Sequence, residues 1–326
     1  MIADERIPLR VVVPQRAGNP PSPDSRIYTF TTNVVEDVPA WNVATAYSPG
    51  ARVSVTTPSL SIAQRGIYEA LANTTGESPQ SFPAKWIRVS AAEVDQPFDK
   101  VVATGARAVA GNITYSLQSQ TTQSDTVILY VDNVVSARVR VIEHLTSNVI
   151  YDQTINLADT SLIVDAWTYF FGRVDLFSSC IFEGVPAFAR NTIEVTLERQ
   201  SPDSTTPFPE AREIVIGQSL NIGNLTSGGR VGIEDFSRKE RDTFGNFNVI
   251  QRAYSDFADF GLILRGNEVD TVRRRLAALR ATPCVYHAGQ ENVGRGLIAF
   301  GFFKDLAIEF TSGPIATCTL SIEGLT

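Results

Sequence analysis

Short stretches in which apolar and polar residues alternate place the strongest limit on what this chain can fold into. In residues 191–200, every second residue from Ile193 to Leu197 is aliphatic, and the residues between them are glutamate or threonine. A period of two gives a β-strand with one buried face and one face in water. Residues 297–310 and 316–325 are further apolar runs, which we expect to pair as the closing strands of the fold.

The segment 126–144 is predicted to form a β-hairpin. Two runs of β-branched residues lie on either side of Asp132 and Asn133. Residues of this type favour the tight turn that joins two antiparallel strands. We therefore expect the two runs to pair with each other.

One helix is clearly predicted, in residues 266–283. Apolar residues recur there at i, i+3, i+7 and i+10 from Val269 onward, which places them on one face of a helix. Asn267 is positioned to cap the start, and Pro283 is expected to end the helix. Residues 248–261 are a weaker candidate for a second helix.

Two proline-rich stretches suggest how the chain is divided. Residues 14–25 predict an extended arm, and residues 201–211, with three prolines, predict a linker. The density of predicted strands in residues 91–200 is typical of a β-sandwich. The predicted parts are an N-terminal arm with strands that join the last domain (1–38), a small module (39–90), a β-sandwich with the linker at its end (91–211) and an α+β domain (212–326).

The small module is bounded by two tryptophans. Trp41 is followed by a Y-x-x-G-x-x-V arrangement that starts at Tyr47, by a Tyr-x-Ala sequence at Tyr68, by a proline-containing loop and by Trp86. This order and spacing resembles the chitin-binding type of carbohydrate-binding module. The resemblance covers about fifty residues and implies a small β-rich unit.

The four aromatic rings of this module have two interpretations. A module of this size buries little surface, so it needs aromatic side chains in its core. Stacking on a sugar instead needs a ring with one face open to water, and residues 71–76, where the family commonly has such rings, contain no aromatic residue. We expect Trp41, Tyr47, Tyr68 and Trp86 to form the core of the module, and carbohydrate contact by one or two of them is the alternative.

The C-terminal block resembles another group of proteins. Three strings carry the resemblance: RKERDTFGNFNVIQRAYSDF at 238–257, LAALRATPCVYHAG at 276–289, and FGFFKDLAIEF followed by ATCTLSIEGL within 300–325. They are similar to distal-tail and baseplate proteins of tailed bacteriophages. The resemblance implies a β-barrel domain that builds a ring, with sugar-module-like appendages outside it.

Five basic residues are candidates for contacts between subunits. Arg238, Lys239 and Arg241 lie in a mixed-charge run, and Arg273 and Arg274 lie off the apolar stripe of the predicted helix. Paired charges at an interface can set the register between subunits. A solvated surface is the alternative for both groups, and contact with phosphate or DNA is a further one for the helix arginines.

Charge and hydropathy limit the partners of the chain. The formal net charge is −7, and binding to nucleic-acid phosphates needs an electropositive face, so nucleic acid is not expected as the primary partner. No stretch approaches the roughly 18 apolar residues of a membrane span, so we expect no membrane insertion. The first residues carry charges and no long apolar run, which predicts neither a signal peptide nor a lipidation signal.

Residues suited to catalysis or metal binding form no recognisable pattern. Cys180, Cys284 and Cys318 are widely spaced, which predicts buried thiols rather than a disulfide framework. Cys284 and His287 form a C-x-x-H sequence, but a zinc site needs four ligands and a Cys–His nucleophile needs an orienting group. Carboxylates are numerous, and none stands in a context typical of a glycosidase pair. We expect no metal, no cofactor and no enzymatic activity.

Together these observations predict a mainly β fold. It has β-barrel or β-sandwich domains, one clear α-helix in the C-terminal block and a small aromatic-rich β module. The resemblance implies a structural protein of the virion, assembled in the host cytoplasm, that forms a homo-oligomeric ring in the tail tip or baseplate and contacts other tail proteins. A receptor-binding adhesin that recognises host surface glycan is the alternative, and a glycan-degrading enzyme is the third interpretation.

Overall fold

Strands dominate the structure, which confirms the predicted mainly β fold. The computed structural model describes residues 7–14, 28–57, 64–108, 111–119, 124–159, 163–171, 175–187, 190–199, 207–226, 229–241, 245–252, 254–288, 298–310 and 315–325. Residues 15–25 of the predicted N-terminal arm and residues 201–206 of the predicted linker fall outside these residues.

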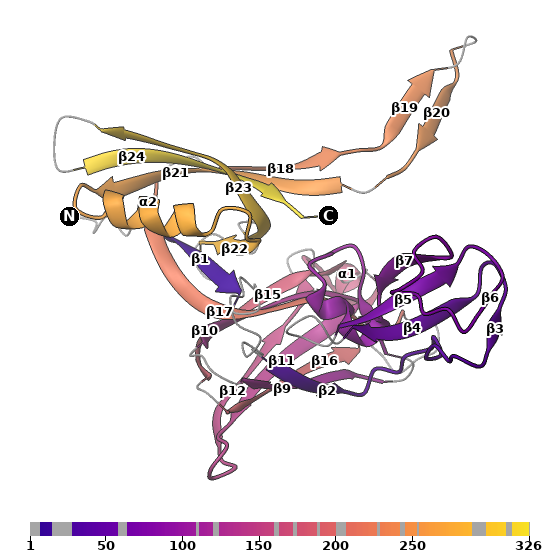
Figure 1. The fold of residues 1–326 in the computed structure, drawn as a ribbon. Helices are drawn as coiled ribbons and strands as arrows, with labels where there is room; N and C mark the ends of the chain where they lie inside the picture. The colour runs from indigo at the N-terminus through magenta and orange to yellow at the C-terminus, as the bar shows by residue number, and fades with distance from the viewer. Residues whose placement is uncertain are drawn as a thin grey trace.

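A closed β-barrel contains most of the C-terminal strands (Figure 1). Its strands are hydrogen-bonded in the circular order β1, β17, β21, β24, β23, β22 and back to β1. The pairing of β23 with β24 confirms the predicted closing strands. The bounds are β1 (Pro8–Pro14), β17 (Glu210–Leu225), β21 (Tyr254–Arg265), β22 (Cys284–His287), β23 (Ile298–Phe310) and β24 (Ile315–Gly324).

Helix α2 (Val269–Ala278) packs against the barrel. Its buried residues Val269, Val272 and Leu276 belong to the same core as Phe260 and Leu262 of β21, so the predicted apolar stripe is the buried face. The helix is shorter than predicted at both ends. Asn267 does not cap it, because the cap position is held by Glu268, which makes no side-chain capping bond.

The prediction of a second helix in residues 248–261 is wrong. This segment contains the end of β20 (Phe247–Ile250) and the first part of β21. Ala258, Phe260 and Leu262 are buried at every second position, and β21 is paired with β24 from Phe257 to Arg265. The period of two, together with a long pairing partner, fixes the segment as a strand.

A β-sandwich adjoins the barrel. One layer consists of β15, β10 and the first half of β17, with β8 beside it, and the other consists of β12, β11, β16, β9 and β2. Val139, Val195 and Phe182 are among the fully buried residues between the layers, and the strand predicted in 191–200 is confirmed as β16. The bounds are β2 (Tyr28–Thr32), β8 (Ala106–Arg107), β9 (Ile113–Ser119), β10 (Ser124–Asp132), β11 (Val134–Ile142), β12 (Val149–Asn156), β15 (Ser179–Ala187) and β16 (Thr192–Arg199).

The predicted hairpin in 126–144 has its turn in the right place, but its strands do not pair. Asn133 has a positive φ of 55° between β10 and β11. β10 pairs with β15 and β17, whereas β11 pairs with β12 and β16 in the opposite layer. The turn therefore carries the chain from one layer of the sandwich to the other, because both strands bury apolar faces that must meet across the core.

Strand β17 belongs to both the sandwich and the barrel. Its residues from Glu210 to Gly217 pair with β10, and those from Gly217 to Asn224 pair with β1 (Figure 1). The boundary predicted between residues 211 and 212 therefore falls inside a continuous strand. The N-terminal part is also divided, since β1 joins the barrel and β2 joins the sandwich.

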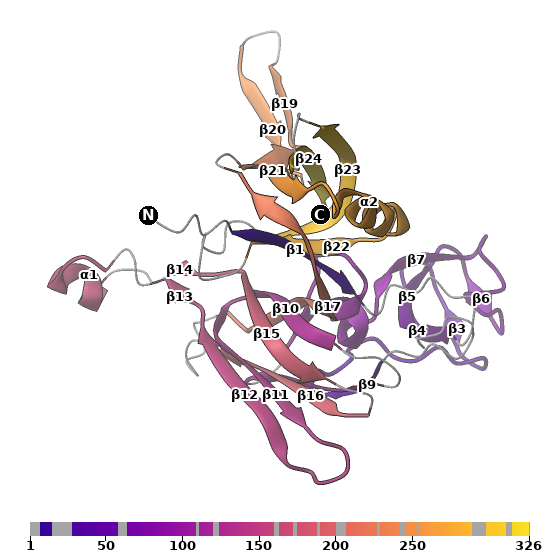
Figure 2. The same cartoon turned by 90° about the vertical axis from the view of Figure 1, so that its left-hand side faces the viewer.

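The small module has a sheet of its own, and other short elements project from the body. Figure 2 shows α1, carried by β13 and β14, and the paired strands β19 and β20 extending away from the rest. The 3-10 helix η1 (Glu93–Phe98) connects the module to the sandwich. The remaining bounds are β3 (Ala46–Tyr47), β4 (Arg52–Thr57), β5 (Gln64–Ala70), β6 (Thr74–Thr75), β7 (Trp86–Ala91), β13 (Ala158–Asp159), α1 (Ala166–Phe171), β14 (Asp175–Leu176), β18 (Arg230–Asp235) and β19 (Arg238–Arg241).

Candidate assembly surface

Several exposed apolar side chains lie on the strands that project from the barrel, β18, β19 and β20. β18 pairs with β21, and β19 pairs only with β20 among the described residues. Phe247 is 64% exposed and Ile233 is 65% exposed. Val231, Phe236, Val249, Ile250 and Tyr254 are also exposed.

This surface is poorly suited to remain in water. A two-stranded hairpin is marginally stable alone, and exposed strand edges with apolar side chains tend to pair with other chains. Contiguous exposed apolar residues commonly mark an interaction site. The β18–β20 segment therefore has the properties of a surface that becomes covered by another protein.

Three of the predicted interface residues lie on the hairpin that β19 and β20 form. Arg238 forms an ion pair with Glu240 at 2.6 Å, and Lys239 forms one with Asp235 at 2.7 Å. The hydrogen bond from Lys239 is the main reason that the pKa of Asp235 lies well below its usual range. The Arg241 guanidinium instead lies over the ring of Phe247, 4.4 Å from its centroid.

The other two predicted interface residues lie elsewhere. Arg273 and Arg274 are exposed on α2, which Figure 1 shows at the opposite end of the barrel from β19 and β20. Arg274 pairs with Asp270 one turn earlier at 3.1 Å, and Arg273 borders a shallow hollow beside Phe310. One chain therefore does not bring the two basic groups together.

The four rings of the small module pack into one cluster with Val53. Trp86 is 2% exposed, and its indole Nε1 donates to the Glu77 carbonyl at 3.1 Å. Tyr47 meets the Trp86 ring edge-on at 5.3 Å, and Trp41 and Tyr68 are half-buried against the same cluster. This packing supports the interpretation of the rings as the core of the module.

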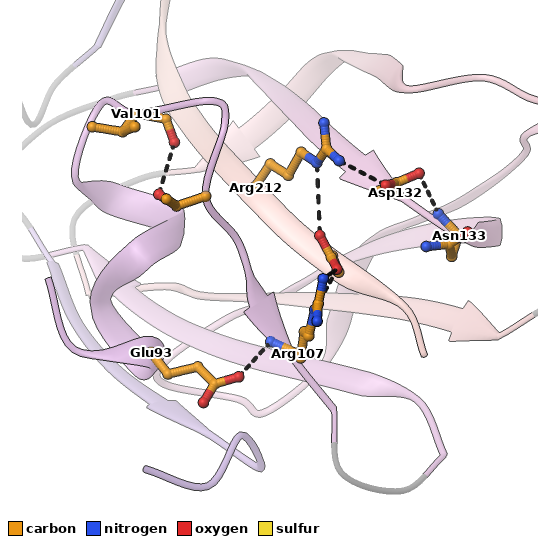
Figure 3. Close-up of polar contacts among 8 residues, drawn as sticks. Glu93, Val101, Arg107, Asp132, Asn133 and Arg212 are labelled. Carbon is orange, nitrogen blue, oxygen red and sulfur yellow. Dashed lines mark hydrogen bonds and ion pairs between the residues drawn. The ribbon is translucent and has the colours of Figure 1, made fainter. Parts of the chain in front are cut away.

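A cluster of ion pairs ties the edge of the sandwich together (Figure 3). Arg212 bonds Asp132 at 2.6 Å and lies 3.8 Å from Glu210, which also pairs with Arg107. Glu93 accepts a bond from the Arg107 backbone N–H at 3.2 Å, and partial burial raises the pKa of Glu93. No sequence pattern predicts this cluster, because its members come from separate elements. Both arginines are already paired, so the cluster acts as a structural tie.

The C-x-x-H sequence lies on β22 and does not form a catalytic pair. Cys284 packs in the barrel core with Tyr286, while His287 is three residues on and faces the other side of the strand. Burial raises the pKa of Cys284 to about 12 and lowers that of His287 to about 4. The thiol is therefore protonated and the imidazole neutral at pH 7. Cys180 and Cys318 are buried too, as predicted.

The described residues contain no group of three or more His, Cys, Asp or Glu side chains arranged to hold a metal ion. None of the helices in the described part of the chain is long and apolar enough to cross a membrane.

Comparison with known proteins identifies no family. No protein-family model and no curated protein matches the chain. Among solved structures, it is similar to a chain in the X-ray crystal structure of reduced XRCC1 bound to DNA pol beta catalytic domain, with 16% identity and a TM-score of 0.24. That match covers 35% of this chain and 77% of the other, and at this TM-score it carries no argument about fold or function.

Proposed function

We propose that this chain is a structural subunit of a bacteriophage tail tip or baseplate, which assembles with copies of itself into a ring and contacts neighbouring tail proteins. The observation that carries the self-assembly part is the exposed apolar surface on the projecting β18–β20 segment. The assignment to a phage tail rests on the sequence resemblance of the C-terminal block.

The architecture suits such a role. Because β17 runs through both the sandwich and the barrel, the two parts form one continuous body that can hold a projecting hairpin in a fixed direction. A surface of one subunit that binds a different surface of the next forms a head-to-tail contact, and a closed series of such contacts is a ring.

The test is the mass of the purified full-length protein, measured by native mass spectrometry and light scattering. We expect a discrete multimer. The double substitution Phe247→Ser and Val249→Thr should shift the protein to smaller species without changing its circular dichroism, because it removes apolar surface that only the multimer buries. Leu145→Ser is the matched control, since Leu145 is 88% exposed in the turn after β11 and should not affect the mass. A wild-type protein that stays monomeric at high concentration would contradict the proposal.

A further inference from the structure

A cavity of about 460 Å³ lies where the base of the hairpin meets the sandwich. Val231, Ile233 and Phe257 of β18 and β21 form one wall, and Phe300 of β23 and Leu325, just after β24, form another. The volume is within the range of pockets that hold a small ligand or a large side chain. The cavity combines apolar walls from the barrel with polar groups from both parts of the molecule.

Two polar groups of this cavity lack a partner. The hydroxyl of Tyr130 is buried and makes no hydrogen bond in the described part of the chain. Asp256 lies on the cavity wall, and no cation among the described residues pairs with it. Its partial burial raises its pKa, which shows the cost of leaving this carboxylate uncompensated. Arg212 also borders the cavity, but its guanidinium is already held by Asp132 and Glu210.

These features define the chemistry of an occupant. The walls require an apolar or aromatic body, and the carboxylate requires a cation. A guanidinium is the best match, because its fixed fork of N–H donors can bond the Asp256 carboxylate and the Tyr130 hydroxyl oxygen together. An arginine presented beside an apolar side chain has both of these properties.

The tip of the hairpin presents this combination. Arg241 and Phe247 are cross-strand neighbours, and the guanidinium is stacked on the ring. The register places Lys239 and Val249 on the same face. Lys239 is paired with Asp235, whereas Arg241 has no carboxylate partner among the described residues. Within the part of the chain that the structure describes, Arg241 is thus a cation without a carboxylate partner, and it lies against the exposed ring of Phe247.

The hairpin of one chain does not enter its own cavity. The strands that carry the hairpin, β18 and β21, form the cavity wall, and β19 and β20 lead away from it (Figure 1). We propose that the hairpin of one copy inserts Phe247 and Arg241 into this cavity of the next copy, where Arg241 donates to Asp256 and to the Tyr130 hydroxyl. The inference rests on the proposed self-assembly and deepens it by naming the contact.

Reversing the charges of Arg241 and Asp256 by substitution tests the contact. The association of the full chain is measured by sedimentation over a range of concentrations. Arg241→Glu and Asp256→Lys should each weaken association by at least about tenfold, because each leaves two like charges facing each other. The double variant should recover most of the loss. Mixing the two single variants should also restore assembly, since each hairpin then meets a cavity of opposite charge in the other variant.

Two matched controls separate the contact from general charge effects. Glu234→Lys makes the same charge change on β18, where Glu234 faces away from Asp256 because its cross-strand partner is Ser255. Arg280→Glu makes the same charge change as Arg241→Glu at an exposed residue just after α2, at the opposite end of the barrel from the hairpin (Figure 1). Both controls should associate like the wild type.

The outcomes distinguish this inference from the proposed function. A wild-type multimer that Arg241→Glu and Asp256→Lys leave intact would overturn the contact and leave self-assembly standing. If association recovers in the double variant but not when the two single variants are mixed, the contact between chains would be overturned. A wild type that is monomeric throughout would overturn the proposed function and this inference with it.

Discussion

At the scale of single residues, the environment of each side chain decides between interpretations that the sequence left open. The tryptophans and tyrosines of the small module were candidates for either a core or a sugar contact. Trp86 is buried beneath Tyr47, which leaves no open face for stacking on a sugar. Trp41 and Tyr68 keep some exposure but pack in the same cluster.

Trp86→Ala is expected to unfold the small module. Removing a buried tryptophan costs roughly 3–5 kcal/mol, and so small a module has little stability to lose. Hydrogen exchange should show lost protection in β4, β5 and β7, with the barrel unaffected. Trp41→Ala should cost less, because Trp41 is only half-buried. Glycan-array binding that disappears in Trp41→Ala while the fold is retained would instead favour the adhesin interpretation.

His287 should make folding stability depend on pH. Burial, with help from the nearby Arg10, lowers its pKa from 6.5 to about 4, although Glu183 lies 3.7 Å from Nδ1 and Asp125 acts in the opposite direction. Between these two values the unfolded chain binds a proton that the folded chain does not. Stability is therefore expected to fall as pH drops from 6.5 towards 4, by up to about 3 kcal/mol.

Denaturant titrations at several pH values would measure this effect. His287→Gln should lose this part of the pH dependence while keeping the parts that come from carboxylates. Equal slopes for wild type and variant between pH 6.5 and 4 would show that His287 is not the group responsible.

At the scale of elements, close approach of backbones limits which residues can occupy β17. Gly217 pairs with both β10 and β1, at the point where the strand passes from the sandwich into the barrel. A Cβ at this position would lie 2.2 Å from the Val13 carbonyl oxygen. Only glycine allows this approach without a shift of β1.

Gly217→Ala is therefore expected to destabilise the protein by about 2 kcal/mol or more, because backbone rather than a flexible side chain must move. Gly229→Ala is the control, since a Cβ there would make only ordinary contacts at 3.7 Å or more. Chemical denaturation of both variants measures the difference. Similar midpoints for the two would contradict the argument from close approach.

At the scale of the whole molecule, a buried apolar cluster joins the sandwich and the barrel in addition to the shared strand β17. A third apolar cluster, which includes Val12, Ile128, Val215 and Phe300, packs between them. It holds residues of β1, β10, β17 and β23 together. The two parts therefore share both backbone pairing and buried surface.

We expect the barrel and the sandwich to unfold in one cooperative transition. Leu129→Ala in the sandwich core and Leu262→Ala in the barrel core should each cost roughly 2–5 kcal/mol. Both substitutions should lower the midpoint of the same calorimetric peak, because loss of either half removes pairing partners of β17. Two peaks, each responding to only one of the substitutions, would show independent domains.

The sequence by itself determined several local features of this protein. Alternation predicted β16, apolar runs predicted the pair β23 and β24, and an apolar stripe predicted α2, because these patterns follow from the geometry of a single strand or helix. The mixed-charge run also made Arg241 a candidate for contacts between subunits. Only the tertiary structure decided that β10 and β11 lie in opposite layers, that β17 serves two cores, and that Tyr130 and Asp256 border one cavity. These relations join residues far apart in the chain, and pairing partners and shared cavities depend on how whole faces pack rather than on any local period.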